Sequence, residues 1–173
     1  SHGTVTVDGH DVVADRRAVQ RRVGVVFANA DHQLVYPTPA EDIALGLRAH
    51  GHTKDEARAL AHEALIAVGL EAKADQAIHT LSGGEKHLVA LSAVLALEPE
   101  WIVIDEPTTT LDYVNRRRVV EVLLGLPHHI VVVTHDLELA ASMDTALLFA
   151  DGRREAVGTP ETVIAEYLAL VGA

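Results

Sequence analysis

The chain has 173 residues, 49% of them apolar and 3% aromatic, with a formal net charge of −11 and no cysteine. This length predicts one domain, or one core with a subdomain, and the apolar fraction is enough for a sizeable aliphatic core. The negative charge argues against a nucleic-acid surface and against docking on anionic lipid, and the lack of cysteine excludes disulfides and thiolate metal sites.

The first part of the chain is expected to begin with short strands and to continue with helices. Thr53 and Glu56 have the spacing of a capping box, which predicts a helix start. The apolar positions that follow have helical spacing, and Gly69 suits the end of that helix. The other expected elements are strands at Thr4–Val7 and Val23–Phe27, a short helical segment around Arg16–Arg22, a loop at Asn29–Pro39, and helices at Pro39–Gly46 and Ser82–Leu97.

From Trp101 onward, apolar strands alternate with helices, which is typical of a parallel sheet covered on both faces. The fold class is therefore α/β, with a helical subdomain at residues 39–97 inserted into a core formed by residues 1–38 and 98–173. The expected elements are strands at Trp101–Ile104, Ile130–Val133 and Ala146–Phe149, helices at Asp112–Leu124 and Leu137–Ala141, and a last helix from Pro160 after the Asp151-Gly152 turn.

Two adjacent carboxylates, Asp105 and Glu106, end the Trp101–Ile104 strand. The carboxyl ends of parallel strands form the ligand-binding edge of such a sheet. There Asp105 is expected to hold Mg²⁺ through water, and Glu106 to orient or deprotonate an attacking water. The alternative is a pair of carboxylates that only caps the next helix.

Ser82, Gly83 and Gly84 open a predicted helix about twenty residues before these carboxylates. Glycines let backbone N–H groups approach an anion closely, and the helix dipole favours negative charge at that end. The expected ligand is a phosphate group. The alternative is an ordinary serine cap.

Three further positions carry both a functional and a structural interpretation. His135, after the Ile130–Val133 strand, can donate to a phosphate oxygen or to the attacking water, or it can be bonded to backbone. Asp112 can contact a neighbouring subunit or simply cap its helix. Gln33 lies in the predicted loop, where it is either an exposed loop residue or a functional one.

These motifs resemble those of the ABC-type ATPases, in the order and spacing of that family. Leu81–Glu85 is similar to the signature motif, Trp101–Glu106 to Walker B, Leu111-Asp112 to the D-loop and His135 to the switch histidine. Within the family, residues 29–34 and 41–46 resemble the energy-coupling-factor and cobalt or nickel uptake ATPases.

The resemblance implies a P-loop NTPase-like (RecA-like) core and an ATPase subunit of an importer, with ATP and Mg²⁺ as its nucleotide and metal. It implies a head-to-tail dimer in which Ser82, Gly83, Gly84, Glu85 and Asp112 belong to the nucleotide site between subunits. It also implies that the Ala28–Pro37 loop meets a transmembrane subunit. The ATPase would then be cytoplasmic and peripheral on the inner face of the membrane.

Two departures from the family matter most. No Gly-x-x-x-x-Gly-Lys-Ser/Thr loop occurs in the 173 residues, so this chain alone is expected not to hydrolyse ATP. The family's glutamine after the strand phenylalanine is replaced by Ala28. An alternative function is therefore a non-hydrolytic dimerisation or regulatory partner of an intact ATPase. With the Walker A strand missing, we expect the Ile130–Val133 strand either to pair with Ala146–Phe149 or with another copy of the chain.

Overall fold

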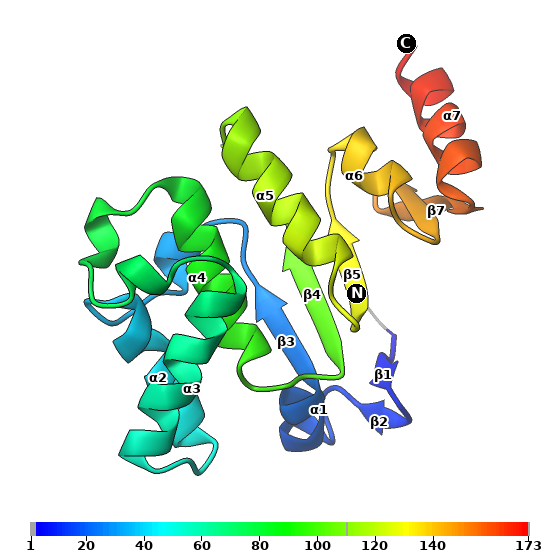
Figure 1. The fold of residues 1–173 in the computed structure, drawn as a ribbon. Helices are drawn as coiled ribbons and strands as arrows, with labels where there is room; N and C mark the ends of the chain where they lie inside the picture. Colours follow the sequence, from blue (N-terminus) through cyan, green and yellow to red (C-terminus); the bar gives the residue numbers. More distant parts are fainter. Residues whose placement is uncertain (1–2, 110, 173) are drawn as a thin grey trace. The chain divides into compact units, whose positions relative to one another are not determined.

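The computed structural model describes residues 3–109 and 111–172 (Figure 1). Its contacts divide the chain into two compact units, Ser1–Val131 and Val132–Ala173. Among the described residues, no helix has the length and apolar character needed to cross a bilayer. The termini of the predicted core, residues 1, 2 and 173, lie outside the described residues.

A three-stranded sheet has the order β3 (Val23–Val26), β4 (Trp101–Asp105) and β5 (His129–Val133), and the boundary between the two units falls within β5, after Val131. β3 and β4 are parallel, with Val23 opposite Trp101 and Val26 opposite Ile104. Parallel neighbours need a crossover between them, and here the crossover is the whole helical segment that separates the two strands in sequence. The predicted parallel α/β core is therefore confirmed for these strands.

A short hairpin precedes that sheet. β1 (Thr6–Val7) pairs with β2 (His10–Asp11) in antiparallel fashion. The two turn residues, Asp8 and Gly9, have φ values of 48° and 81°. Two successive positive φ angles are the geometry of a type I′ turn, which matches the twist of paired strands. α1 (Arg16–Arg22) follows the hairpin and leads into β3.

After α1, the helices of the first unit are α2 (Pro39–Ala49), α3 (Lys54–Ala67), α4 (Gly83–Leu95) and α5 (Tyr113–Leu124). Three short 3-10 turns connect them: η1 (Ala30–His32), η2 (Glu71–Lys73) and η3 (Ile78–Thr80). The predicted capping box of α3 is present. Glu56 N donates to Thr53 Oγ1 over 3.4 Å, and Thr53 N donates to Glu56 Oε2 over 2.8 Å.

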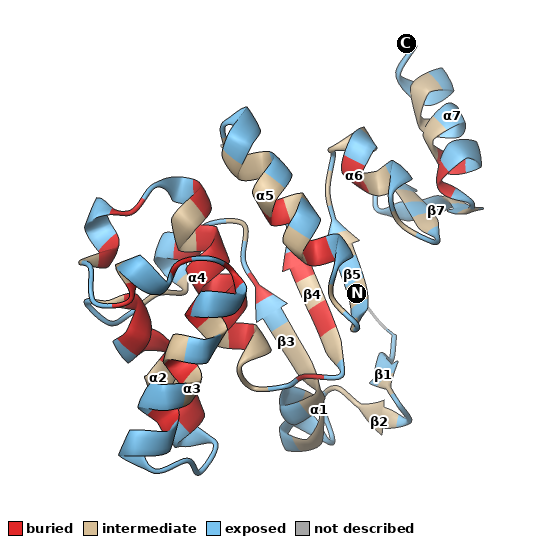
Figure 2. Cartoon of the chain, viewed as in Figure 1, coloured by how far each residue is buried: buried red, intermediate tan, exposed pale blue. Residues whose placement is uncertain are grey.

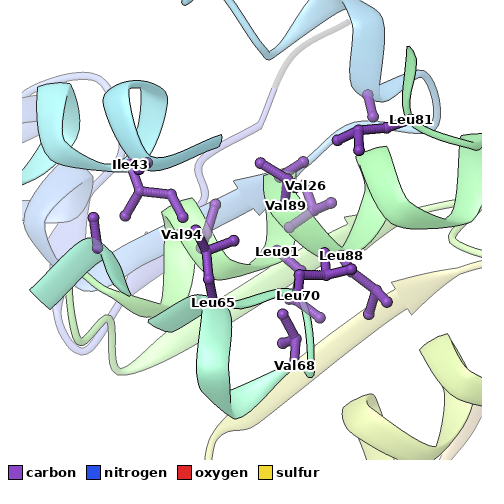
Figure 3. Packing of buried hydrophobic residues seen from close by; sticks show 14 of the residues in the cluster. Val26, Ile43, Leu65, Val68, Leu70, Leu81, Leu88, Val89, Leu91 and Val94 are labelled. Atoms are coloured by element: carbon purple, nitrogen blue, oxygen red, sulfur yellow. The ribbon is translucent and has the colours of Figure 1, made fainter. Parts of the chain in front are cut away.

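One apolar cluster joins these helices to the sheet, with α4 at its centre (Figures 2 and 3). Burying each large aliphatic side chain of this kind stabilises the fold by about 1.5–3 kcal/mol. β3 packs tightly against α4 at Gly24. A Cβ atom on Gly24 would overlap Val94 Cγ1 of α4 and lie 3.2 Å from Pro99 Cγ. The members labelled in Figure 3 are Val26, Ile43, Leu65, Val68, Leu70, Leu81, Leu88, Val89, Leu91 and Val94.

The second unit contains α6 (Leu137–Ala141), β6 (Ala146–Ala150), β7 (Arg153–Gly158) and α7 (Pro160–Val171). β6 and β7 form an antiparallel pair, and α7 packs on both strands. The turn between them, Asp151-Gly152, has φ values of 49° and 73°, the geometry of the first hairpin.

The expectation that the Ala146–Phe149 strand moves in beside Ile130–Val133 is wrong. β6 belongs to a two-stranded sheet with β7, and β5 to the separate sheet of β3 and β4. The physical reason is local. A tight turn brings β7 to β6 at a small cost in loop-closure entropy, whereas pairing with β5 requires a longer closure.

Candidate functional site

The start of α4 is an exposed turn held by a capping box. Ser82 Oγ accepts a hydrogen bond from Glu85 N over 3.3 Å, and Glu85 Oε2 accepts one from Ser82 N over 2.9 Å. Ser82 and Gly83 are exposed, while Gly84 is buried. The first turn of an α-helix has N–H groups with no partner inside the helix, so this accessible helix end suits an anion such as phosphate.

Glu85 is ion-paired with Lys73 of η2. The Lys73 ammonium, together with the backbone N–H of Ser82, holds the pKa of the Glu85 carboxyl below its usual value. The carboxylate therefore remains charged at neutral pH and joins the helix start to η2. Its predicted contribution to a nucleotide site stays a prediction.

Gly84 brings the start of α4 against α5. A Cβ atom on Gly84 would lie 2.5 Å from Asn115 Cγ and 2.7 Å from Asn115 Oδ1. Only glycine allows this approach without displacing α5. The same turn lies close to Leu111, whose Cδ2 would be 3.8 Å from a Cβ atom on Gly83.

Asp112 caps α5 and also holds Asn115. Its Oδ1 accepts hydrogen bonds from Val114 N and Asn115 N, both over 3.0 Å, and its Oδ2 accepts one from Asn115 Nδ2 over 2.6 Å. The Asn115 backbone N–H and then the Asn115 amide lower the pKa of Asp112. The structure thus brings two predicted segments together, Ser82–Gly84 and Asp112, with Asn115 between them.

Asp105 and Glu106 stand at the carboxyl end of β4, as the sequence predicts. Glu106 has a φ of 47°, in the left-handed region that a side chain other than glycine enters at a cost. Thr109 Oγ1 donates to Glu106 Oε2 over 3.0 Å, which fixes the carboxylate beside the strand end. The predicted chemical role of Glu106 stays a prediction.

The residues at the end of β4 suit Mg²⁺, which keeps several of its waters, better than a metal ion coordinated only by protein side chains. Asp105 is exposed and offers carboxylate oxygens, the ligand type that Mg²⁺ prefers. Within the described residues, no group of three or more histidine, aspartate or glutamate side chains is arranged to hold a metal ion. Mg²⁺ ordinarily keeps several waters and is bound through one or two carboxylates plus substrate phosphates.

His135 follows β5 in the second unit, where it is exposed and precedes the cap of α6, Asp136. Asp136 Oδ1 accepts hydrogen bonds from Glu138 N over 3.1 Å and Leu139 N over 3.2 Å. The position of His135 directly after a strand is as predicted. Its approach to a phosphate, and to Glu106, stays a prediction.

Gln33 fastens the loop after β3 to the end of that strand. Its Oε1 accepts from Phe27 N over 3.1 Å, and its Nε2 donates to Val25 O over 3.3 Å. The sequence left Gln33 as either an exposed loop residue or a functional one. These contacts show that its side chain holds the loop to the end of β3. Asp42 does the same further on, because its Oδ1 accepts from Val35 N over 2.7 Å and Tyr36 N over 2.9 Å.

Several residues that shape the site belong to none of the predicted motifs. His87 and Lys86 connect α4 to the Ala28–Pro37 loop, Asn115 contacts Gly84, and Lys73 pairs with Glu85. Only His87 carried a local signal, since it lies four residues after Gly83 and one helical turn permits a side-chain bond to that carbonyl. The other contacts join residues far apart in the sequence.

Comparisons with known proteins agree on one family. A family model described as ABC transporter matches residues 1–109. The biotin transport ATP-binding protein BioM of Rhizobium etli is 41% identical over 165 residues, which cover 95% of this chain and 73% of that protein.

Two solved structures share the fold. The structure of cbiO1 from Clostridium perfringens, part of the ABC transporter complex cbiONQ, has a TM-score of 0.83 and 28% identity. The match covers 99% of this chain and 72% of that one. A dimeric ATP-binding cassette in a post-hydrolysis state with ADP and phosphate has a TM-score of 0.79 and 27% identity over 92% of this chain and 74% of its own.

Proposed function

Because the chain belongs to the family of ABC transporter ATP-binding proteins, we propose that it contributes the signature, Walker B and switch residues of an importer ATPase. The observation that carries the proposal is the exposed helix start at Ser82 and Gly83, seated through Gly84 and Asn115 beside Asp112. It presents helix N–H groups and a D-loop carboxylate side by side.

The proposed chemistry is hydrolysis of Mg·ATP at the boundary between two ATPase subunits. Asp105 would hold the Mg²⁺ ion, which neutralises charge on the phosphates when bound. Glu106, fixed by Thr109, would accept the proton of the attacking water or orient that water. His135 would donate to a γ-phosphate oxygen, and Ser82 with Gly83 and Gly84 would bind the nucleotide held by the other subunit.

The proposed partners are a second ATPase subunit and a transmembrane coupling subunit. A solved dimeric cassette of the same fold supports the first partner. The Ala28–Pro37 loop would contact the second, and the ATPase would then lie on the inner face of the membrane. A vitamin or a metal ion such as cobalt is the proposed class of solute, in keeping with a relative named for biotin transport and a structural neighbour from a cbiONQ complex.

We further propose that a polypeptide of these 173 residues does not hydrolyse ATP by itself. The sequence carries no Gly-x-x-x-x-Gly-Lys-Ser/Thr loop, so several charge-assisted phosphate contacts, each worth about 1.5–3 kcal/mol, are lacking. The alternative of a non-hydrolytic partner rests on the same observation.

Titration with Mg·ATP tests this part of the proposal. The polypeptide should show no binding in the sub-millimolar range. Sub-millimolar binding would contradict the view that these residues lack a grip on the nucleotide.

Adding the loop separates the two functions. A Walker A segment from a related ATPase, placed ahead of Gly3, should produce ATP hydrolysis. Glu106→Gln should abolish it, whereas the control Glu121→Gln, an exposed carboxyl of α5, should leave the rate within about twofold. A fusion that binds Mg·ATP and never hydrolyses it would favour the non-hydrolytic partner.

A further inference from the structure

The side chain of His87 joins two distant parts of the first unit. Its Nε2 lies 2.9 Å from Ala28 O, and its Nδ1 lies 3.0 Å from Gly83 O. The residue is only 6% exposed, so water does not compete for these contacts. Gly83 belongs to the exposed helix start, and Ala28 begins the loop that runs to Pro37. One ring therefore touches both segments.

Lys86, the preceding residue, makes a second connection to the same loop. Its Nζ lies 2.7 Å from Asp31 Oδ1, and its side chain is 17% exposed. Asp31 lies in η1, which is closed by its own cap, because Asn29 Oδ1 accepts from Asp31 N over 2.9 Å. Two adjacent residues of the first turn of α4 thus hold two points of the loop.

The loop is anchored at both ends. Gln33 bonds to Val25 O of β3 and to Phe27 N, and Asp42 of α2 bonds to Val35 N and Tyr36 N. The first part of the loop has a separate connection to the helix start, through His87 at Ala28 and Lys86 at Asp31.

We propose that His87 is a positioning residue that transmits movement between the Ala28–Pro37 loop and the Ser82–Gly84 turn. The inference rests on the proposed function, which assigns the turn to nucleotide and the loop to a membrane subunit. Both partners are carbonyl oxygens and a neutral imidazole carries one N–H, so the ring donates to one of them at a time. The proposal assigns the donated bond to Ala28 O, and the contact with Gly83 O lies within a single helical turn.

Two substitutions separate the two bonds. The amide nitrogen of Gln lies near the position of histidine Nε2, and that of Asn near Nδ1. His87→Gln therefore retains a donor toward Ala28 O, and His87→Asn retains a donor toward Gly83 O. His50→Asn is the matched control, because His50 Nδ1 bonds to Gly46 O over 2.9 Å within α2, in the same local geometry.

The experiment uses the protein purified from its own cells with the subunits that remain bound to it. Amide hydrogen exchange is followed across residues 28–37 with and without Mg·ATP. In the unmodified protein and in His87→Gln and His50→Asn, Mg·ATP should slow exchange in the loop. In His87→Asn that response should fall about fivefold, the loss expected for one hydrogen bond. Asp31→Asn, at an exposed position, should reduce the response in the same direction without threatening the fold.

The possible outcomes separate a failure of the assignment of His87 from a failure of the proposed function. If the purified protein hydrolyses Mg·ATP but His87→Asn and Asp31→Asn both keep the full loop response, the assignment of His87 is overturned. An unmodified protein with no loop response overturns it as well. If the purified protein does not hydrolyse Mg·ATP, the proposed function fails, and the inference fails with it.

Discussion

Gly84 and Asn115 occupy positions where α4 and α5 approach so closely that no side chain fits on the glycine. Asn115 cannot turn away, because Asp112 Oδ2 accepts a hydrogen bond from its amide over 2.6 Å. The second glycine of the signature turn therefore has a packing reason within its own chain, in addition to its proposed role at the nucleotide. The two roles predict different effects of mutation.

Gly84→Ala is expected to destabilise the fold by about 1–3 kcal/mol, the usual cost of inserting a methyl group into a packed site. Denaturant unfolding of the 173-residue polypeptide measures this loss. The double variant Gly84→Ala with Asn115→Gly removes the atoms that the new methyl group meets, and it should recover part of the loss. A double variant less stable than the sum of the two single changes would contradict this packing.

The ion pair of Glu85 with Lys73 should make part of the stability depend on pH and salt. The pKa of Glu85 is lowered in the folded chain from its usual 4.5, so its contribution is present above that value and is lost as the pH falls through the folded pKa. Glu85→Gln should cost about 0.5–1 kcal/mol at pH 7. Below about pH 4.5 the difference between the two proteins should shrink.

Glu56 of α3 provides the matched control, since it also completes a capping box but has Thr53 as its chief partner. Added salt should weaken the contribution of Glu85 and leave that of Glu56 nearly unchanged, because salt screens ion pairs more than hydrogen bonds within a cap. Equal salt dependence in Glu85→Gln and Glu56→Gln would show that Lys73 contributes nothing. Thermal unfolding at several ionic strengths measures both.

Gln33 should stabilise the loop after β3 rather than act on a ligand. Gln33→Ala removes two hydrogen bonds, to Phe27 N and Val25 O, at a cost of about 1–2 kcal/mol. Exchange of the Phe27 amide should accelerate in the same variant. Gln76→Ala is the control, because the Gln76 side chain donates to Thr80 Oγ1 in a neighbouring turn and its loss should leave the Phe27 amide unaffected. An unchanged Phe27 amide in Gln33→Ala would refute the bracing.

Motifs formed by residues close together in the sequence predicted much of this fold. The spacing of Thr53 and Glu56 located the start of α3, and Asp151-Gly152 located the turn between β6 and β7, because both signals depend on bonds formed within a few residues. The order of strands and helices after Trp101 followed from apolar periodicity in the same way. The predicted extents of the helical subdomain, residues 39–97, stay a prediction.

The contacts that shape the site could not be predicted, because they join residues far apart in the chain. His87 meets Ala28 59 residues away, and no periodicity indicates such a pair. The predicted pairing of β6 with β5 was wrong for a related reason. Without a Walker A strand among these residues, a free edge was expected on β5, but the tight Asp151-Gly152 turn pairs β6 with β7.

Arg118 of α5 should anchor the end of α3. Its Nη2 donates to Val68 O over 2.6 Å and to Gly69 O over 2.9 Å, at the carboxyl end of that helix. A positive charge there also interacts favourably with the helix dipole. Arg118→Met keeps the length of the side chain and removes both bonds, so it should lower the free energy of unfolding by about 1.5–3 kcal/mol. Arg117, an exposed neighbour whose guanidinium lies 6.0 Å from the Tyr113 ring centroid, is the control. Arg117→Met should cost less than about 1 kcal/mol, and a loss as large as that of Arg118→Met would mean that charge on α5, rather than the contact with α3, sets the stability.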